Sequence, residues 1–460
     1  MNSGNRKRSP RHDLTRASGS ASVVGTLLAD SLRRLLTWAP GADGRLVVLA
    51  AVVVYLGAVA AGRLVWGTDV WPLLGVPSGP SLFFDARNLT AAWECQRLGY
   101  DTLYASPCDP WGRPLNYPRA WLLLGVLGLD QSHTFALASV LIVAMFSSFG
   151  LLLGRIPIGT GIVVALVACS PAVMLAVERA NLDIAIFSML AVALLAWRGF
   201  PRLAPVISPA VVLLAATAKV YPAFALPAFV LTRNRIAARA ALVCLAAFGV
   251  YLAASLRDIS HIARIAPQGE LFAYGARILP AHLYHQLGAD HWAGPAVVKQ
   301  LIAVVPLTVL VAALTRRVRR QHAPADDEPS SVTASFLALN AATLIYLGTF
   351  AIGNNFDYRL VFLLLTLPQL VEWARTPAHR LSRLALTTLA AIVRLLWVGS
   401  LSEALRLWDE VASWVVAALL AALYAATLPP IEVIRDLVLG RRARAAWRRQ
   451  RTRAHSSIAT

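Results

Sequence analysis

The chain has 460 residues, of which 57% are hydrophobic and only 15% are charged, and its mean hydropathy is +0.60. A soluble protein has about 25% charged residues, so this composition excludes an ordinary soluble enzyme and indicates a membrane protein. The formal net charge of +19 does not predict nucleic-acid binding, because the basic residues fall in short clusters between apolar runs, as in cytoplasmic loops.

The N-terminal region, 1–45, is basic and is rich in Ser and Gly as far as Ala21. It predicts a partly disordered cytoplasmic tail with an amphipathic stretch near 31–38. The first apolar run begins near Leu46, too far into the chain for a cleaved signal peptide, so we expect an uncleaved span.

Residues 46–430 predict an all-α polytopic domain. A span needs about 20 apolar residues, fewer where it is short or broken, which gives about 12 transmembrane helices, with a range of 10–13. A shorter apolar run, Trp121–Leu129, predicts a helix half-buried at the membrane surface. The candidate spans lie near 46–65, 134–153, 158–176, 183–197, 204–218, 222–232, 239–256, 296–314, 333–352, 360–373, 384–400 and 410–428.

Arginine clusters fall on alternate connections, which predicts that both termini are cytoplasmic in a cell inner (plasma) membrane. Two long loops, 67–118 and 257–299, are then extracytoplasmic and should carry short interfacial helices. The C-terminal segment 431–460 is basic and predicts a cytoplasmic anchor on the inner leaflet.

The first outer loop is the predicted site, because polar, acidic and aromatic residues are concentrated between two apolar segments. It opens with Asp85, just beyond the first span. A carboxylate partly removed from water at a membrane boundary is suited to general-base catalysis. The alternative is that Asp85 only caps the helix predicted to follow it, from Ala86 to Leu98.

A second polar cluster, Glu178–Asp183, separates two apolar runs with no room for a long loop. Charges at this depth usually face a cavity or each other. Arg179, Asn181 and Asp183 could therefore line a substrate site, or an Arg179–Asp183 pair could simply close a helical hairpin.

Two cations at the outer ends of apolar runs are candidate phosphate ligands. Lys219, followed by Tyr221 and Pro222, could bind a lipid phosphate or could extend to the membrane surface. Arg359 could bind the same phosphate, with Asp357 as its partner. The alternative is an Asp357–Arg359 pair that only caps the neighbouring helices.

Four cysteines are present. Cys95 and Cys108 share the first outer loop, where the compartment permits a disulfide, and both the disulfide and two free thiols remain open. Cys169 and Cys244 fall in apolar runs and are expected to be small core residues. Histidines in the third outer loop have no reinforcing cysteine or paired acid, so no metal site is assigned to His261, His282, His285 or His291.

Five short polar motifs recur at the ends of the apolar runs: Asp85, Gly99-Tyr100-Asp101-Thr102-Leu103-Tyr104, Tyr117-Pro118, Asn181-Leu182-Asp183 and Lys219-Val220-Tyr221-Pro222. Together they resemble those of the bacterial GT-C glycosyltransferases, and most closely glycosyltransferase family 87, the polyprenyl-phosphate-mannose-dependent mannosyltransferase-like proteins. The resemblance covers roughly residues 46–375. The sequence departs from the family at Arg119, where a second proline is usual, and in having a single acid, Asp85, at the start of the loop.

The resemblance implies a GT-C-like fold and transfer of a sugar, mannose by analogy, from a polyprenyl-phosphate-sugar donor to an envelope lipid or glycan acceptor. Asp85 would be the general base of an inverting reaction on the periplasmic or extracellular face, without metal or cofactor. A multi-pass transporter or lipid flippase, and a non-catalytic scaffold, are the alternatives. The residues expected to bind the donor or its phosphate are Lys219, Arg179, Arg359, Tyr117, Asn181, Asp183, Tyr221 and Asp357.

Overall fold

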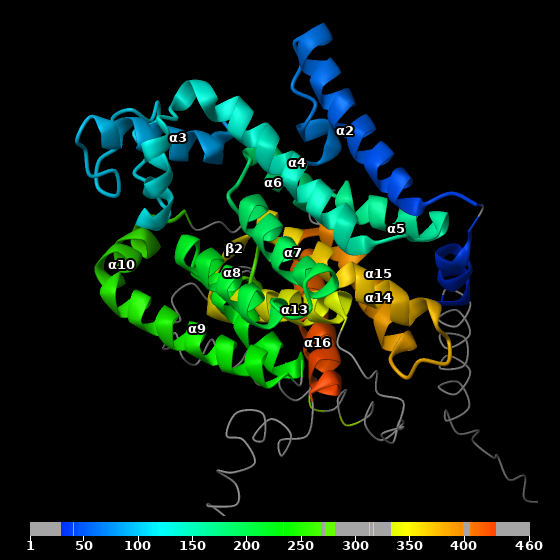
Figure 1. Ribbon diagram of the computed structural model, residues 1–460. Coiled ribbons are helices and arrows are strands. Elements are labelled where there is room, and N and C mark those ends of the chain that lie inside the picture. The colour runs from blue at the N-terminus through cyan, green and yellow to red at the C-terminus, as the bar shows by residue number, and fades with distance from the viewer. Residues whose placement is uncertain are drawn as a thin grey trace, which may run out of the picture.

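The computed structural model shows a helical protein in which long apolar helices pack together with shorter, broken ones (Figure 1). The structure describes residues 29–39, 41–232, 234–267, 272–280, 312, 316, 333–398 and 405–428. The predicted disordered tail, the histidines at 282, 285 and 291, most of the candidate span 296–314 and the basic segment 431–460 lie outside the described residues.

The first predicted span is confirmed as a helix, α2 (Gly44–Trp66). It begins where the Asp43 side chain accepts a hydrogen bond from the Arg45 backbone N–H, and it ends at Gly67, whose positive φ of 62° suits glycine. Residues 29–37 form a preceding helix, in the stretch where the sequence predicts an amphipathic one.

The first outer loop and the segment that follows it contain four short helical elements. The helix α3 (Phe84–Arg97) starts one residue before Asp85, and the 3₁₀ helix η2 (Arg119–Leu127) forms at the predicted interfacial run. Leu123, Val126 and Leu127 of η2 are largely exposed, as expected for a helix at a membrane surface. The other two elements are η1 (Pro72–Leu74) and η3 (Gln131–His133).

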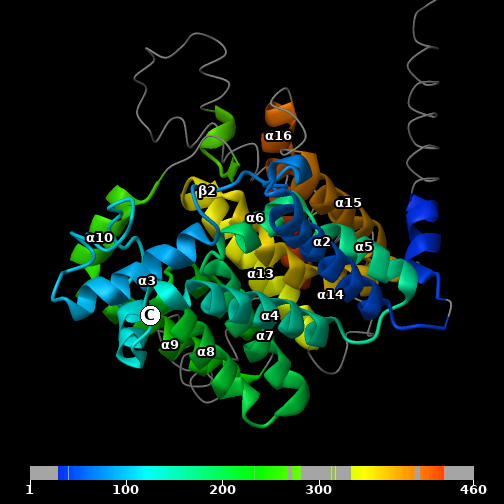
Figure 2. The same ribbon diagram turned by 90° about the horizontal axis from the view of Figure 1, so that it is seen from above.

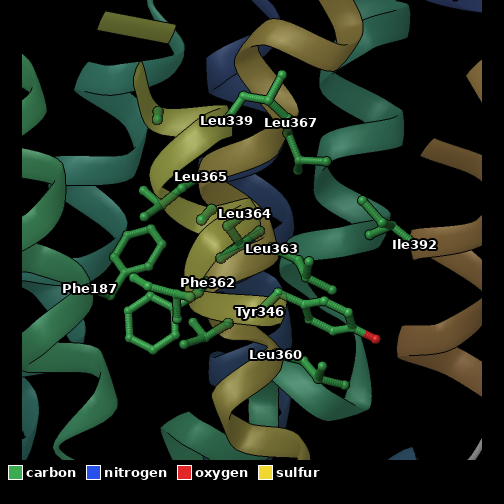
Figure 3. Close-up of a cluster of buried hydrophobic side chains, with 14 of the residues drawn as sticks. Phe187, Leu339, Tyr346, Leu360, Phe362, Leu363, Leu364, Leu365, Leu367 and Ile392 are labelled. Carbon is green, nitrogen blue, oxygen red and sulfur yellow. The ribbon is translucent and has the colours of Figure 1, made fainter. Parts of the chain in front are cut away.

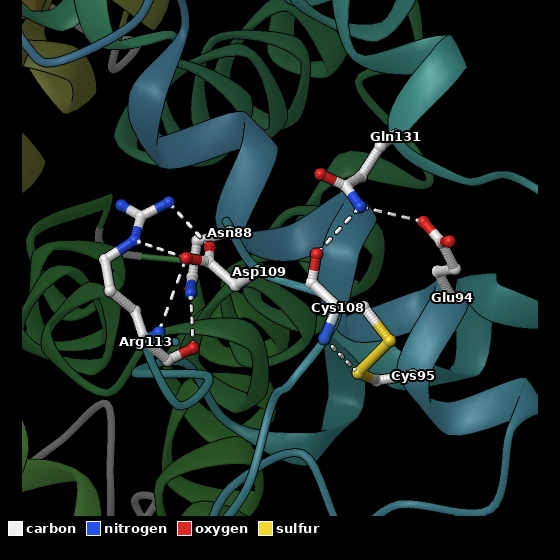
Figure 4. The surroundings of a disulfide bond; sticks show 7 residues. All are labelled: Asn88, Glu94, Cys95, Cys108, Asp109, Arg113 and Gln131. Carbon is white, nitrogen blue, oxygen red and sulfur yellow. Dashed lines mark hydrogen bonds and ion pairs between the residues drawn. A yellow bond between two sulfur atoms is a disulfide. The ribbon is translucent and has the colours of Figure 1, made fainter. Parts of the chain in front are cut away.

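A disulfide between Cys95 and Cys108 ties the end of α3 to the loop that follows it (Figure 4). The structure therefore resolves the question left open by the sequence in favour of the bond. Gln131 donates hydrogen bonds from one amide nitrogen to the Glu94 carboxylate and to the Cys108 carbonyl, both at 2.9 Å. These contacts fix the loop against the start of the next helix.

The remaining elements form a bundle around a buried core (Figures 1 and 2). Two two-residue strands pair antiparallel, with Ala273 opposite Phe356 and Tyr274 opposite Asn355. The helices are α4 (Thr134–Leu153), α5 (Ile158–Ala168), α6 (Pro171–Arg179), α7 (Asp183–Gly199), α8 (Ala204–Ala218), η4 (Tyr221–Thr232), α9 (Arg235–Ala254), α10 (Leu256–Ile265), α13 (Ala334–Ile352), η5 (Asp357–Thr366), α14 (Leu367–Arg375), α15 (Ser382–Val398) and α16 (Arg406–Thr427), and the strands are β1 (Ala273–Tyr274) and β2 (Asn355–Phe356).

The core includes η5, whose residues from Leu360 to Leu365 are all buried (Figure 3). Phe187 of α7 packs near Phe362, with ring centroids 6.3 Å apart. A helix that is apolar on every side is expected to be enclosed by other helices, and η5 is enclosed in this way.

Glycine allows α2 and α5 to approach closely. A Cβ atom at Gly161 would lie 2.2 Å from the Gly44 carbonyl oxygen, so any side chain there would force the helices apart. Small residues at helix contacts are typical of membrane proteins, where close packing drives helix association.

Five described helices are long and apolar enough to cross a membrane, or six if the bent pair α5–α6, with an angle of 56°, forms one span. The other predicted spans correspond to shorter helices such as α7, α8 and η4, or lie outside the described residues. A largely helical protein with several apolar helices long enough to span a membrane is confirmed for the described residues. A polytopic arrangement of about 12 spans with a GT-C-like fold stays a prediction.

Candidate active site

The polar residues of the site lie where three apolar helices are interrupted. Ala180, with φ of 42°, separates α6 from α7. Lys219 has an extended backbone between α8 and η4, and the turn at Gly353 and strand β2 separate α13 from η5. Irregular backbone at membrane depth is tolerated only where protein or water satisfies it, so three such breaks together indicate a functional site.

Two side chains from other elements satisfy the carbonyl groups at the end of α8. The Trp121 indole N–H donates to the Ala218 oxygen at 2.9 Å, and the Tyr251 hydroxyl donates to the Thr217 oxygen at 2.9 Å. Trp93 of α3 in turn donates to the Trp121 carbonyl at 2.8 Å. This chain of contacts connects the first outer loop to the break at Lys219.

The centre of the site is the carboxylate of Asp183, which is completely buried. It is paired with the Lys219 ammonium and with Arg359 Nε, the latter at 3.3 Å. The Tyr221 hydroxyl donates to the same carboxylate at 2.7 Å. Two cations thus face one anion, which leaves one positive charge in excess within this group.

Asn181 links this ion cluster to Asp85. Its amide nitrogen donates to Asp85 Oδ2 at 2.6 Å, and its amide oxygen accepts from Lys219 Nζ at 3.1 Å. Asn181 is 1% exposed, whereas Asp85 is only half-buried, so the carboxylate is held at the edge of the buried network. The excess positive charge and the Asp85 carboxylate are therefore separated by one amide group.

Tyrosine rings surround the Lys219 ammonium. Its nitrogen lies 5.1 Å from the centroid of Tyr117, 5.8 Å from that of Tyr358 and 5.9 Å from that of Tyr221. Ring faces attract a cation, most strongly where water is excluded, and here they restrict the position of the ammonium. Lys219 does not extend to the membrane surface, so that alternative is wrong.

Asp85 does not act as the N-cap of α3. The capping position belongs to Phe83, which has a positive φ of 59° and makes no side-chain cap, and Asp85 lies in the first turn. Glu178 holds this turn, since its carboxylate accepts the Gly79 N–H at 2.8 Å and its carbonyl accepts the Phe83 N–H at 3.1 Å. The segment that supplies Asn181 therefore also fixes the backbone that carries Asp85.

A second ion pair, in the segment just after Cys108, supports the start of α3 (Figure 4). Arg113 Nη2 lies 2.8 Å from Asp109 Oδ2 and donates to the Phe84 carbonyl at 3.1 Å. Burial raises the pKa of Asp109, but the hydrogen bonds that its carboxylate accepts from Arg113 and from the Trp111 backbone, together with the Arg113 charge, outweigh burial. The pKa of Asp109 therefore lies below its ordinary value. The ion pair therefore holds the residue that immediately precedes Asp85.

Arg119, at the position where the sequence departs from the family pattern, joins the two outer loops. Its guanidinium lies 2.9 Å from Asp101 Oδ2 and 2.8 Å from Asp258 Oδ2 of α10. The hydrogen bond from Arg119 lowers the pKa of Asp101. Asp101 is thus engaged in a surface contact between loops, outside the buried network.

Two predicted pairings are wrong in detail. Arg179 lies 3.6 Å from the Glu178 carboxylate, so the Arg179–Asp183 pair considered from the sequence is not formed. Arg359 pairs with Asp183 and donates to the Asn355 side chain, so its partner is Asp183 where the sequence suggested Asp357.

The structure brings Asp85, Tyr117, Asn181, Asp183, Lys219, Tyr221 and Arg359 into one contact network, whereas Arg179 and Asp357 lie beside it. Sequence reasoning missed the roles of Tyr358, Asn355 and Arg113. The first two fall within the polar stretch 354–359 that the sequence did single out, so their motif was visible although their contacts were not. Nothing in the sequence distinguishes Arg113 from other loop arginines.

Among the described residues, no group of His, Cys, Asp and Glu has a geometry that could hold a metal ion. His261 instead packs against Tyr104, with ring centroids 4.3 Å apart and the ring planes tilted by 37°. No protein-family model matches the sequence, and no curated protein or solved structure is found to be similar to it.

Proposed function

We propose that this protein is a membrane glycosyltransferase that transfers a sugar, mannose by analogy, from a polyprenyl-phosphate donor to an envelope lipid or glycan on the extracytoplasmic face. The observation that carries the proposal is the contact from Asn181 to Asp85, which places a half-buried carboxylate beside a buried cluster with excess positive charge. Base and anion-stabilising cations are the two components that displacement of a phosphate by a hydroxyl requires.

In the proposed reaction, Asp85 accepts the proton of the acceptor hydroxyl. The hydroxyl oxygen then bonds to the anomeric carbon as the bond from that carbon to the phosphate oxygen breaks, with inversion. The leaving phosphate keeps the electron pair, and Lys219 and Arg359 stabilise its charge. Asn181 orients Asp85, and Tyr117 and Tyr221 restrict the position of Lys219.

The disulfide supports the extracytoplasmic assignment. Disulfides persist in oxidising compartments and are rare in the cytosol. The loop closed by Cys95 and Cys108 follows the helix that carries Asp85, so both belong to the same side of the membrane.

The decisive experiment compares wild type and Asp85→Asn in reconstituted membranes that contain radiolabelled polyprenyl-phosphate mannose and cell-envelope acceptors. We expect wild type to transfer sugar and Asp85→Asn to lose about 10²-fold or more of the rate, the usual contribution of a general base. Asp130→Asn is the matched control, because Asp130 is a partly exposed carboxylate that caps the short helix η3. Equal rates in Asp85→Asn and wild type would remove Asp85 from the mechanism.

A transporter or lipid flippase is the second candidate, and the three interrupted helices favour it. Substrate sites of many transporters lie at such interruptions near the middle of the membrane. Movement of the labelled lipid across sealed vesicles without formation of a glycosylated product, in wild type and in Asp85→Asn alike, would support this candidate over the transferase.

A further inference from the structure

A separate cavity of about 230 Å³ lies between α2 and α4, near the C-terminal end of α2. The two helices pack against each other, and Figure 1 shows them in neighbouring positions. The wall is almost entirely apolar and is contributed mainly by Leu56, Val59, Ala60, Phe135 and Ile142. None of these residues takes part in the buried ion network.

The cavity has the size of a short stretch of hydrocarbon chain. An apolar cavity of about 150 Å³ stays dry and accepts benzene, so by proportion this one accommodates roughly nine carbon atoms. Both bordering helices are candidate membrane spans, and α2 leaves much of its apolar surface exposed, for example at Val53 and Val54. The cavity therefore borders a surface that is apolar enough to contact lipid chains.

The rim of the cavity carries one fixed charge of each sign. Arg63, in the last turn of α2, and Asp69, in the loop after it, both line the cavity and are exposed. Asp69 is oriented by the Trp71 backbone N–H, which donates to its Oδ1 at 3.2 Å. A headgroup that contains a phosphate and an ammonium complements this pair, with the phosphate at Arg63 and the ammonium at Asp69.

We propose that this cavity binds one acyl chain of a phosphatidylethanolamine molecule from the outer leaflet, with the phosphoethanolamine headgroup at Arg63 and Asp69. Charge complementarity favours this lipid over the two lipids that lack a cationic headgroup. A polyprenyl phosphate has no ammonium for Asp69, and phosphatidylglycerol lacks it as well.

The bound chain would contact the turn that carries Asp85. Leu82 and Phe83 form part of the cavity wall, and Phe83, with its positive φ, lies two residues before Asp85. Val177, which also lines the cavity, precedes the residue that holds this turn. The lipid would therefore fill space behind the turn, whether or not the protein transfers a sugar.

The test is photo-crosslinking in vesicles of phosphatidylethanolamine and phosphatidylglycerol that contain a trace of phosphatidylethanolamine with a diazirine in its acyl chain. Ala60→Trp fills the cavity and should reduce crosslinking to the α2 and α4 peptides by about tenfold. Ala58→Trp is the matched control, because Ala58 is exposed on the same helix and does not line the cavity. Ile142→Trp and Val143→Trp form an independent pair on α4.

Headgroup selectivity is read from the same assay by competition with unlabelled lipids. On wild type, unlabelled phosphatidylethanolamine should displace the labelled lipid at concentrations several-fold lower than phosphatidylglycerol does. The Asp69→Asn variant should lose this preference. Equal crosslinking in the filled and control variants, or stronger competition by polyprenyl phosphate, would overturn the proposal. Because the assay measures binding alone, a failure of sugar transfer leaves its result unaffected.

Discussion

At the scale of single residues, the stability of the site depends on the balance of positive and negative charges buried inside a low-dielectric bundle. Asp183 faces two cations, and each of its oxygens has a different one as partner. A buried charge that loses its partner is far more costly than a buried pair that remains intact. The loss of stability caused by a substitution in this cluster therefore depends on which buried charge is left without a partner.

We expect Asp183→Asn to be more destabilising than Lys219→Met. The first change leaves two buried cations that repel each other and should cost about 3–5 kcal/mol, the usual effect of breaking a buried pair. The second leaves the Asp183–Arg359 pair in place. Thermal unfolding in detergent micelles measures both, and the double variant should be more stable than Asp183→Asn alone. The charge argument fails if Lys219→Met is the more damaging single change.

At the scale of elements, the sequence predicts where helices form better than it predicts which side chains of different elements contact each other. The first span and the polar stretches at 85, 178–183, 219 and 354–359 are visible because charges interrupt apolar runs. The choice of Asp183 over Asp357 as partner of Arg359 was not predictable. It depends on how η5 packs against α6 and α7, which are more than 150 residues away in the chain. The sequence could not decide whether Cys95 and Cys108 form a disulfide for a similar reason, since the distance between two loop cysteines is set by tertiary structure.

The Asp109–Arg113 pair predicts a pH dependence of stability. Because the folded-state pKa of Asp109 is lowered, its contribution is fully present above the unfolded-state pKa of about 3.9 and is lost as pH falls through the folded-state value. Asp109→Asn should thus be less stable than wild type near about pH 6, and the difference should narrow below about pH 4.

The measurement is the unfolding midpoint of each variant across this pH range. Asp30→Asn, which removes an exposed ion pair with Arg33, is the control and should change the midpoint little at any pH. A difference for Asp109→Asn that stays constant with pH would contradict the assignment.

At the scale of the whole molecule, the distribution of arginine predicts which face each loop occupies. The first outer loop holds the disulfide and Asp85. Arg198, in the last turn of α7, and Arg202, in the connection to α8, are expected on the opposite side. Cys169 is half-buried and Cys244 is buried, so neither thiol should obscure labelling of an exposed cysteine introduced elsewhere.

A membrane-impermeant maleimide tests this topology in intact cells. Tyr100→Cys should be labelled without permeabilisation, because Tyr100 is 47% exposed in the first outer loop. Arg202→Cys, also at an exposed position, should be labelled only after permeabilisation. Labelling of both residues, or of Arg202→Cys alone, in intact cells would reverse or invalidate the proposed orientation.

The 3₁₀ winding of η4 has a consequence for the length of the bundle. Its 12 residues rise by about 2.0 Å each and cover about 24 Å, a distance for which an α-helix needs about 16 residues. Rewinding η4 as an α-helix would shorten it by about 6 Å, roughly twice the length of a hydrogen bond. Tyr221, at its first position, could not then keep its contact with Asp183 while the other end of η4 stayed in place. The 3₁₀ pitch of η4 thus sets the position of Tyr221 relative to Asp183.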